Sequence, residues 1–311
     1  MDAANQFSLW RWAGFVIVVL AFLALDLGMF RRKAAEVNFR QSLLWSLIWL
    51  LLAFGSAATL TLWMGREQGL QFLAGYVVEW SLSLDNLFAM ALIFAWFGVP
   101  SALQHRVLFW GIIGALVMRG LMIGAGAALL AEFHGILYLM GAFLVWTGLK
   151  WGFSSHAVVQ PEKNRLVRIA RKLFPVTPDF EGRHFFGVVE GHRALTPLAL
   201  ALLTVEATDL VFATDSIPAV FAVTQNAYII FTSNICAVLG LRSLYFVLAE
   251  AMAYFRFLKT GVALVLVFIG SKMLISRWYA VPTAVMLAVV AGVIGVSILF
   301  SRLPAAGNKT N

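Results

Sequence analysis

The sequence is poor in cysteine and in charged residues. One of its 311 residues is a cysteine, Cys236, so the chain has no disulfide framework and no cysteine-based metal site. Charged residues make up only 12% of the chain. The sequence contains no phosphate-binding P-loop, His-Glu zinc motif or nucleophile elbow. We therefore expect neither an enzyme nor an ATP-driven pump, and no organic cofactor.

Apolar residues dominate what remains. They make up 61% of the chain, and the mean hydropathy is +0.87. They run through whole segments of about 20 residues instead of recurring at amphipathic spacing. Such segments cross a bilayer as helices, because a helix pairs its own backbone polar groups. The sequence therefore predicts an all-α, polytopic membrane protein.

Nine apolar segments predict about nine transmembrane helices. They cover residues 12–30, 43–64, 70–97, 107–130, 136–151, 196–223, 228–249, 258–276 and 281–300. One sizeable polar loop, residues 153–195, is rich in Lys and Arg. Within it, residues 164–174 place apolar side chains opposite basic ones, which predicts a short helix on the anionic membrane surface or in solvent.

The net charge of +8 follows the connections between spans, so it indicates membrane topology and not nucleic-acid binding. The connections on one side carry 16 Lys and Arg residues, and those on the other side carry three. Basic residues concentrate on the cytoplasmic side of membrane proteins. We therefore predict an N-terminus outside and a C-terminus in the cytoplasm.

Carboxylates interrupt two of the apolar segments. Residues 204–218 contain Glu206, Asp209 and Asp215 within a run of membrane-spanning length. An ionisable side chain at bilayer depth costs at least about 2.5–3.5 kcal/mol on insertion scales, so it normally faces a partner or a wet cavity. These three acids therefore indicate an ion or substrate path.

Ionisable residues recur in the same order in two parts of the chain. Glu79 and Asp85 in EWSLSLDN are six residues apart, as are Asp209 and Asp215 in DLVFATDS. Each pair is followed by an arginine and a lysine in later apolar segments, and the matching residues are Arg119 with Arg242 and Lys150 with Lys272. Each unit holds three spans, so the second enters the membrane from the opposite side. The sequence thus predicts an inverted repeat, a plan common among secondary transporters.

The repeat divides the chain into five regions. Residues 1–66 hold two spans, residues 67–152 form the first repeat, and residues 153–195 form a basic cytoplasmic loop. Residues 196–277 form the second, inverted repeat, and residues 278–311 hold the ninth span and a short cytoplasmic tail.

Transporters with inverted repeats often bind substrate on interrupted helices near the midplane. Residues 70–97 and 196–223 are longer than a span requires, and Pro218 cannot donate a helical hydrogen bond. We predict breaks in both segments, with Pro218 as the main one, and convergence of the five acids between them.

Buried ion pairs are the alternative reading of these acids. Arg119 and Arg242 could neutralise two of them and merely fix helix packing, but five acids against two arginines leave three negative charges for protons or a cation. Lys150 and Lys272 lie near helix ends, where packing or lipid contacts explain them as well as gating does.

The candidate ligands are oxygens, which suits a hard cation such as Mn²⁺, Mg²⁺ or Ca²⁺. None of the five histidines lies in the middle of a span, which disfavours zinc and copper. Residue types alone do not distinguish the three hard cations.

The motifs now quoted carry a family resemblance. The segments EWSLSLDNLF, VEATDLVFATDSIPAVFAVT, TSNICAVLGLRSLYF and VLVFIGSKMLI resemble the signature segments of the TerC family, and the layout is similar to that of its Alx branch. The resemblance implies a bacterial inner-membrane protein that exports manganese. It also implies a set of metal-binding residues: Glu79, Asp85, Asn86, Glu206, Asp209, Asp215 and Ser216.

Together these inferences predict a secondary transporter for Mn²⁺, with the lipid bilayer as its surroundings and protons as a candidate exchange partner. They leave the oligomeric state open. Two alternatives remain: a membrane partner for metalation or assembly of exported proteins, and a resistance factor for tellurite or alkaline stress. The surplus of acid argues against an anion carrier.

Overall fold

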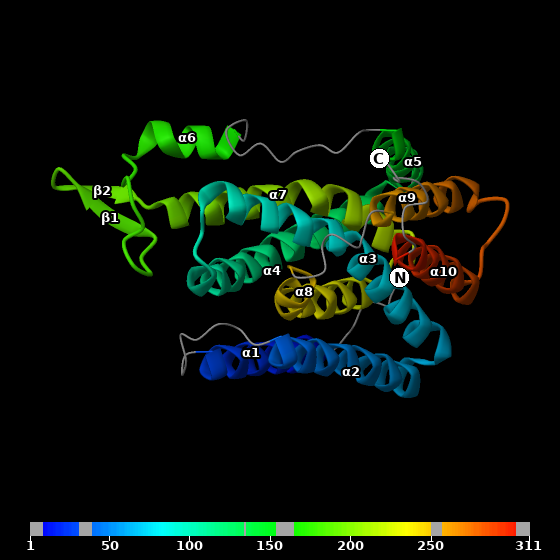
Figure 1. Cartoon of the computed structure of the whole chain (residues 1–311). Helices are drawn as coiled ribbons and strands as arrows, with labels where there is room; N and C mark the ends of the chain where they lie inside the picture. Colours follow the sequence, from blue (N-terminus) through cyan, green and yellow to red (C-terminus); the bar gives the residue numbers. More distant parts are fainter. Residues whose placement is uncertain (1–8, 31–38, 134, 154–164, 250–256, 303–311) are drawn as a thin grey trace, which may run out of the picture.

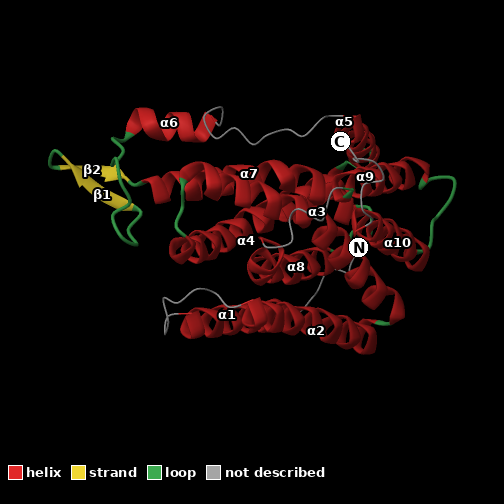
Figure 2. Ribbon diagram, viewed as in Figure 1, coloured by secondary structure: helices red, strands yellow, loops and turns green. Residues whose placement is uncertain are grey.

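The computed structural model describes residues 9–30, 39–133, 135–153, 165–249 and 257–302. These residues form ten helices and one two-stranded hairpin, arranged as a helical bundle with the hairpin at one end (Figure 1, Figure 2). The elements are α1 (Leu9–Phe30), α2 (Phe39–Met64), α3 (Arg66–Phe97), α4 (Ser101–Glu132), α5 (Ile136–Phe153), α6 (Arg165–Leu173), β1 (Phe186–Val189), β2 (His192–Leu195), α7 (Pro197–Phe221), α8 (Ala227–Ala249), α9 (Leu258–Ile275) and α10 (Thr283–Arg302).

The predicted spans are confirmed as helices. Among the described residues, eight helices, α2 to α5 and α7 to α10, are long and apolar enough to cross a membrane. The described apolar stretch of α1, Trp12–Phe22, is shorter. Outward-facing apolar residues such as Leu62, Leu121 and Val211 are well exposed, as expected for side chains that contact lipid.

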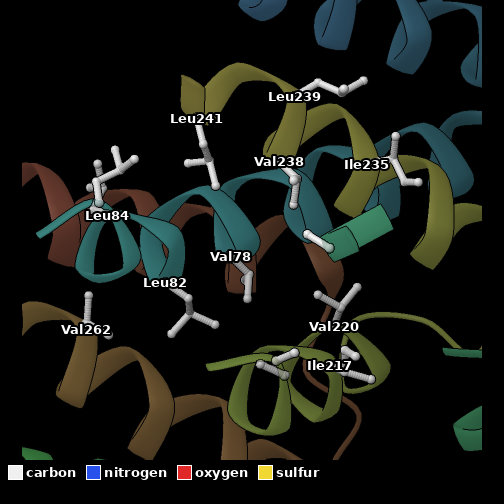
Figure 3. Close-up of a cluster of buried hydrophobic side chains, with 14 of the residues drawn as sticks. Val78, Leu82, Leu84, Ile217, Val220, Ile235, Val238, Leu239, Leu241 and Val262 are labelled. Carbon is white, nitrogen blue, oxygen red and sulfur yellow. The ribbon is translucent and has the colours of Figure 1, made fainter. Parts of the chain in front are cut away.

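α3 is the central helix of the bundle and contacts α2, α7, α8 and α10. Its apolar side chains pack between those of α8 and α7, as Figure 3 shows for Val78, Leu82, Val238 and Ile217. α1 and α2 cover one side of this core (Figure 1), where Trp12 packs on Tyr228 of α8 with ring centroids 5.2 Å apart.

The predicted helix breaks are wrong. α3 is continuous over 32 residues, and α7 continues through Pro218 to Phe221. Pro218 lies in the last turn, where its missing N–H removes one hydrogen bond, and the Ala222 amide still donates to the Pro218 carbonyl at 3.1 Å. The extra length therefore extends α3 beyond the hydrocarbon core, since 32 residues span about 48 Å.

The basic loop contains more structure than its sequence predicts. The expected short helix is present as α6, and β1 and β2 add an antiparallel hairpin. Val167 of α6 is buried against Leu195 and the start of α7. That start is capped by Thr196, whose hydroxyl accepts the Ala199 amide at 3.3 Å, a common helix-initiating arrangement before proline.

The contacts between α5 and α9 fit the predicted two-fold relation. A Cβ on Gly141 would lie 3.0 Å from the Gly270 carbonyl oxygen, and one on Gly148 would lie 2.8 Å from that of Ala263. When the two repeats are aligned on Lys150 and Lys272, Gly148 corresponds to Gly270 and Gly141 to Ala263. The two contacts are therefore equivalent, each being the other with the repeats exchanged. The two helices therefore cross antiparallel with their backbones touching.

A second pair of contacts follows the same relation. A Cβ on Gly75 of α3 would lie 2.8 Å from the hydroxyl of Ser233 on α8, and one on Gly111 of α4 would lie 3.4 Å from a methyl group of Val205 on α7. Gly75 and Val205 are equivalent when the repeats are aligned on Glu79 and Asp209. Gly111 and Ser233 correspond within one residue when the repeats are aligned on their arginines. Each repeat thus packs its first helix against the second helix of the other repeat.

Candidate functional site

Two acids related by the repeat meet at one arginine inside the bundle. Arg119 on α4 forms ion pairs with Glu79 on α3 and Asp209 on α7. Its Nη2 donates to Asp209 Oδ1 at 2.9 Å and its Nε to Oδ2 at 3.3 Å, so the guanidinium holds this carboxylate with two hydrogen bonds. The exposed fractions of Arg119, Glu79 and Asp209 are 1%, 0% and 5%. Buried charges persist at such depth only when they are paired this closely.

Neutral side chains complete this cluster. Asn234 on α8 accepts from Arg119 Nη1 at 3.2 Å and donates to Glu79 Oε2 at 2.9 Å. Asn86 Nδ2 donates to Asp209 Oδ1 at 3.1 Å, and Ser83 Oγ donates to Glu79 Oε1 at 3.3 Å. Four helices, α3, α4, α7 and α8, therefore meet at one set of side chains. We call it the central polar network: Glu79, Ser83, Asn86, Arg119, Asp209 and Asn234.

The helical spacing of α3 explains why it contributes three members. Glu79, Ser83 and Asn86 lie at i, i+4 and i+7, which places them on one face of the helix. One oxygen of these side chains has no hydrogen-bond partner: Asn86 Oδ1 is buried and accepts no hydrogen bond from any described residue. It is an oxygen ligand available beside Asp209.

Glu206 lies one turn before Asp209 on α7 and acts electrostatically on it. Its carboxylate packs against Gly114 of α4, in the space that a Cβ at Gly114 would fill. Among the described residues, none donates a hydrogen bond to this carboxylate. Glu206 therefore adds a negative charge at the edge of the central polar network without being part of it.

Asp215 forms a separate group between α7 and α5. The carboxylate is buried, with 7% of the residue exposed, and Thr147 and Lys150 of α5 lie beside it. The buried hydroxyl of Thr147 points at the Asp215 carboxylate, and the buried hydroxyl of Ser216 makes no hydrogen bond within the described part of the chain. The Lys150 ammonium also lies 4.9 Å from the centre of the Trp146 ring. This region combines one carboxylate, one cation and two buried hydroxyls.

Asp85, the repeat equivalent of Asp215, is half-buried on α3. Lys259 near the start of α9 attracts it electrostatically. The two equivalent acids thus have different basic neighbours.

Lys272, the repeat equivalent of Lys150, ties helix ends together. Its ammonium donates to the Ala222 carbonyl at the end of α7 at 2.8 Å. Glu67 at the start of α3 attracts it electrostatically and accepts a hydrogen bond from Thr283 of α10. A lysine that caps the end of a neighbouring helix agrees with the packing role considered above and not with a lipid contact.

The structure brings some predicted site residues together and keeps others apart. Glu79, Asp209, Asn86 and Arg119 share one network, with Glu206 beside it. Asp215 and Ser216 lie elsewhere on α7, and Asp85 has its own partner. Within the described residues no three acidic, histidine or cysteine side chains gather as a metal-binding group, so the convergence of all five acids is not what this structure shows. The side chain of Arg242 lies outside the described residues.

Sequence reasoning missed three residues of these groups. Asn234 is a polar residue inside an apolar segment, which is a usable signal. Thr147 gave no signal because a threonine in a span usually bonds its own helix. Lys259 was counted as a topology charge at a helix start.

Comparison with known proteins gives consistent results along nearly the whole chain. The sequence profile of the Integral membrane protein TerC family matches residues 64–309. A relative from Myxococcus xanthus, "Uncharacterized membrane protein STKORF319", is 50% identical over 300 residues, which cover 96% of this chain and 94% of the relative. "Putative membrane-bound redox modulator Alx" from Escherichia coli (strain K12) is 41% identical over 299 residues, covering 93% of each chain. No solved structure matches this chain.

Proposed function

Because this chain belongs to the TerC family of integral membrane proteins, we propose that it is a secondary transporter that exports Mn²⁺ across the inner membrane of a bacterium. The observation that supports this most is the meeting of Glu79 and Asp209 on Arg119. Two repeat-related acids meet inside the bundle, at the interface of the two repeats. Inverted-repeat transporters place their substrate sites there.

Surplus negative charge favours a cation as the substrate. Glu79 and Asp209 pair with one arginine, and Glu206 lies beside Asp209, so with all three acids ionised two negative charges remain in the central region. Buried charge of this size calls for a counter-ion. The available ligands are carboxylate, amide and hydroxyl oxygens, which hard divalent ions prefer.

Export is the direction that the resemblance to the TerC family implies, and the basic residues predict which face of the protein is cytosolic. With the N-terminus outside and the C-terminus in the cytoplasm, the basic loop that contains α6 faces the cytosol. Cytosolic Mn²⁺ enters the bundle, and protons or the membrane potential drive its release outside. Protons compete with a metal for carboxylate ligands, which provides a basis for exchange.

Flux measurements on purified protein in liposomes test the proposal. Asp209→Asn removes one of the two central carboxylate charges and is expected to abolish Mn²⁺ flux. Glu132→Gln is the matched control, since Glu132 is an exposed acid at the end of α4. Equal flux in the two variants would show that the central carboxylates do not carry the ion, and flux indifferent to pH would count against proton exchange.

A role as a membrane partner of other proteins is the second candidate. Leu173 at the end of α6 and Phe186 and Val188 on β1 are 69%, 65% and 65% exposed. Exposed apolar side chains on an extramembrane unit are typical of contact surfaces. Replacing Phe186 and Val188 by serine should leave flux intact and would impair function in cells only if this surface binds a partner.

The name of the Escherichia coli relative describes a redox modulator. The only cysteine of this chain, Cys236, is buried, and a dithiol mechanism needs a pair of accessible thiols. Thiol exchange within the chain therefore has no support.

A further inference from the structure

We propose that Arg119 is a tethered cation. It occupies the carboxylates of Glu79 and Asp209 when no metal is bound, and it moves to Glu206 when a divalent cation takes its place. The inference rests on the proposed function and describes how the site is regulated.

The first step is that Arg119 and its neighbours occupy every oxygen of the two central carboxylates. Both Asp209 oxygens accept from the guanidinium. Glu79 Oε1 accepts from Arg119 and Ser83, and Oε2 accepts from Asn234. A metal ion coordinates oxygen lone pairs and repels a guanidinium. A divalent cation can therefore bind these carboxylates only if Arg119 leaves them.

The second step is the charge of the region. Three acids, Glu79, Asp209 and Glu206, and one guanidinium carry a formal charge of minus two when all three acids are ionised. One divalent cation makes the region neutral, whereas a monovalent cation would leave one negative charge. Neutrality inside a bundle avoids most of the desolvation cost of separated ions, so the composition of the site selects divalent ions, provided that Arg119 stays in it.

The third step is a place for the displaced guanidinium. Glu206 lies three residues before Asp209, on the same side of α7. Its carboxylate packs against Gly114 of α4, the helix that carries Arg119. α4 and α7 run in the same direction, as the contacts Gly111 to Val205 and Arg119 to Asp209 show. The guanidinium therefore moves by about one helical turn, roughly 5 Å, to change from one acid to the next.

The fourth step concerns the ligands that the metal gains. Asn86 Oδ1 is buried and unpaired among the described residues, while Nδ2 of the same amide already holds Asp209. Asn86 thus presents an oxygen next to the carboxylate that Arg119 would vacate. Amide and carboxylate oxygens together suit a hard divalent ion.

Mn²⁺ binding to the purified full-length chain in lipid nanodiscs, measured by calorimetry with the metal alone, tests the proposal. Arg119→Gln removes the competing cation and is expected to tighten Mn²⁺ binding by at least about tenfold, or about 1.4 kcal/mol. Glu206→Gln removes the alternative partner and is expected to weaken binding by a similar factor. In the double variant the Glu206→Gln effect should disappear. Arg106→Gln, on the same helix but near Phe185, should bind like the wild type.

Two results would overturn the proposal. One is an unchanged or weaker affinity of a folded Arg119→Gln protein. The other is an equal loss of Mn²⁺ affinity from Glu206→Gln in the wild-type and the Arg119→Gln protein, which would make Glu206 a direct ligand of the metal. If Arg119→Gln does not fold because it leaves two acids unpaired, Arg119→Lys serves in the same cycle. Lysine lacks the planar fork of the guanidinium group and holds carboxylates less firmly. The Arg119→Lys protein should therefore bind Mn²⁺ more tightly than the wild type. Absence of Mn²⁺ binding in the wild type and every variant would refute the proposed function itself.

Discussion

Replacing Gly114 by alanine probes the position of Glu206 without changing a charged residue. A Cβ at Gly114 would overlap the Glu206 carboxylate. The carboxylate is the far end of a flexible side chain, so it moves while α4 and α7 stay in place. Gly124→Ala is the matched control, because it makes the same change on the same helix and its Cβ would have no neighbour within 4 Å.

The two variants should have similar stability and different transport. Alanine is favoured over glycine inside a helix by about 1 kcal/mol, so neither protein should unfold more readily than the wild type. Moving Glu206 away from α4 removes the proposed second partner of Arg119. One charge-assisted hydrogen bond is worth about 1.5–3 kcal/mol, which corresponds to a loss of about tenfold to a hundredfold in Mn²⁺ flux for Gly114→Ala.

The assay is Mn²⁺ uptake into proteoliposomes at matched protein density, together with thermal unfolding of the same samples. Flux from Gly114→Ala that equals flux from Gly124→Ala would refute the reasoning, since it would show that the place of Glu206 beside α4 is irrelevant to transport. A fall in both flux and unfolding temperature would instead point to damaged packing.

Three further predictions concern the contact between α5 and α9, the ion pairs of Arg119 and the pH dependence of metal binding. Gly270→Ala should destabilise the fold by about 1–3 kcal/mol in thermal unfolding, because its Cβ would lie 2.6 Å from the Gly141 carbonyl oxygen; Gly292→Ala, with no neighbour within 4 Å, should not. Asp209→Ala should cost about 3–5 kcal/mol by leaving Arg119 with one acid, whereas Glu132→Ala at an exposed site should stay within about 0.5 kcal/mol of wild type. Mn²⁺ binding should weaken on acidification, since protons and metal compete for the same carboxylates, and a calorimetric affinity that does not change with pH would contradict this.

The helices could be predicted because their signal is the length of each apolar run. The ends are less accurate, since α4 begins at Ser101, before the apolar part of the segment. The hairpin could not be foreseen because its turn, Glu190 and Gly191, has positive φ at both residues without the Asn-Gly or Asp-Gly pair that usually marks such turns.

The members of the site could be predicted more reliably than their partners. A charge inside an apolar segment identifies Glu79, Asp209 and Arg119 as buried polar groups whatever the fold is. Pairing depends on which helices touch, and the sequence alone does not specify it. The predicted break at Pro218 is wrong because α7 continues through this proline to Phe221; the proline removes one helical hydrogen bond, but only three residues of the helix follow it, so a kink there would redirect little of the helix.

The contacts of Lys150 and Lys272 show that the two repeats are not equivalent in this structure. Lys272 binds the end of α7 and lies near Glu67, whereas Lys150 packs on Trp146 and lies beside Asp215. A transporter built from inverted repeats becomes inward-facing or outward-facing by giving equivalent residues different contacts, because exchanging those contacts converts one state into the other. If the proposed transport function holds, the end of the bundle tied by Lys272 is the closed end here. Replacing Lys272 by glutamine should then shift the balance toward the opposite state, seen as altered accessibility of a cysteine placed at Ala222.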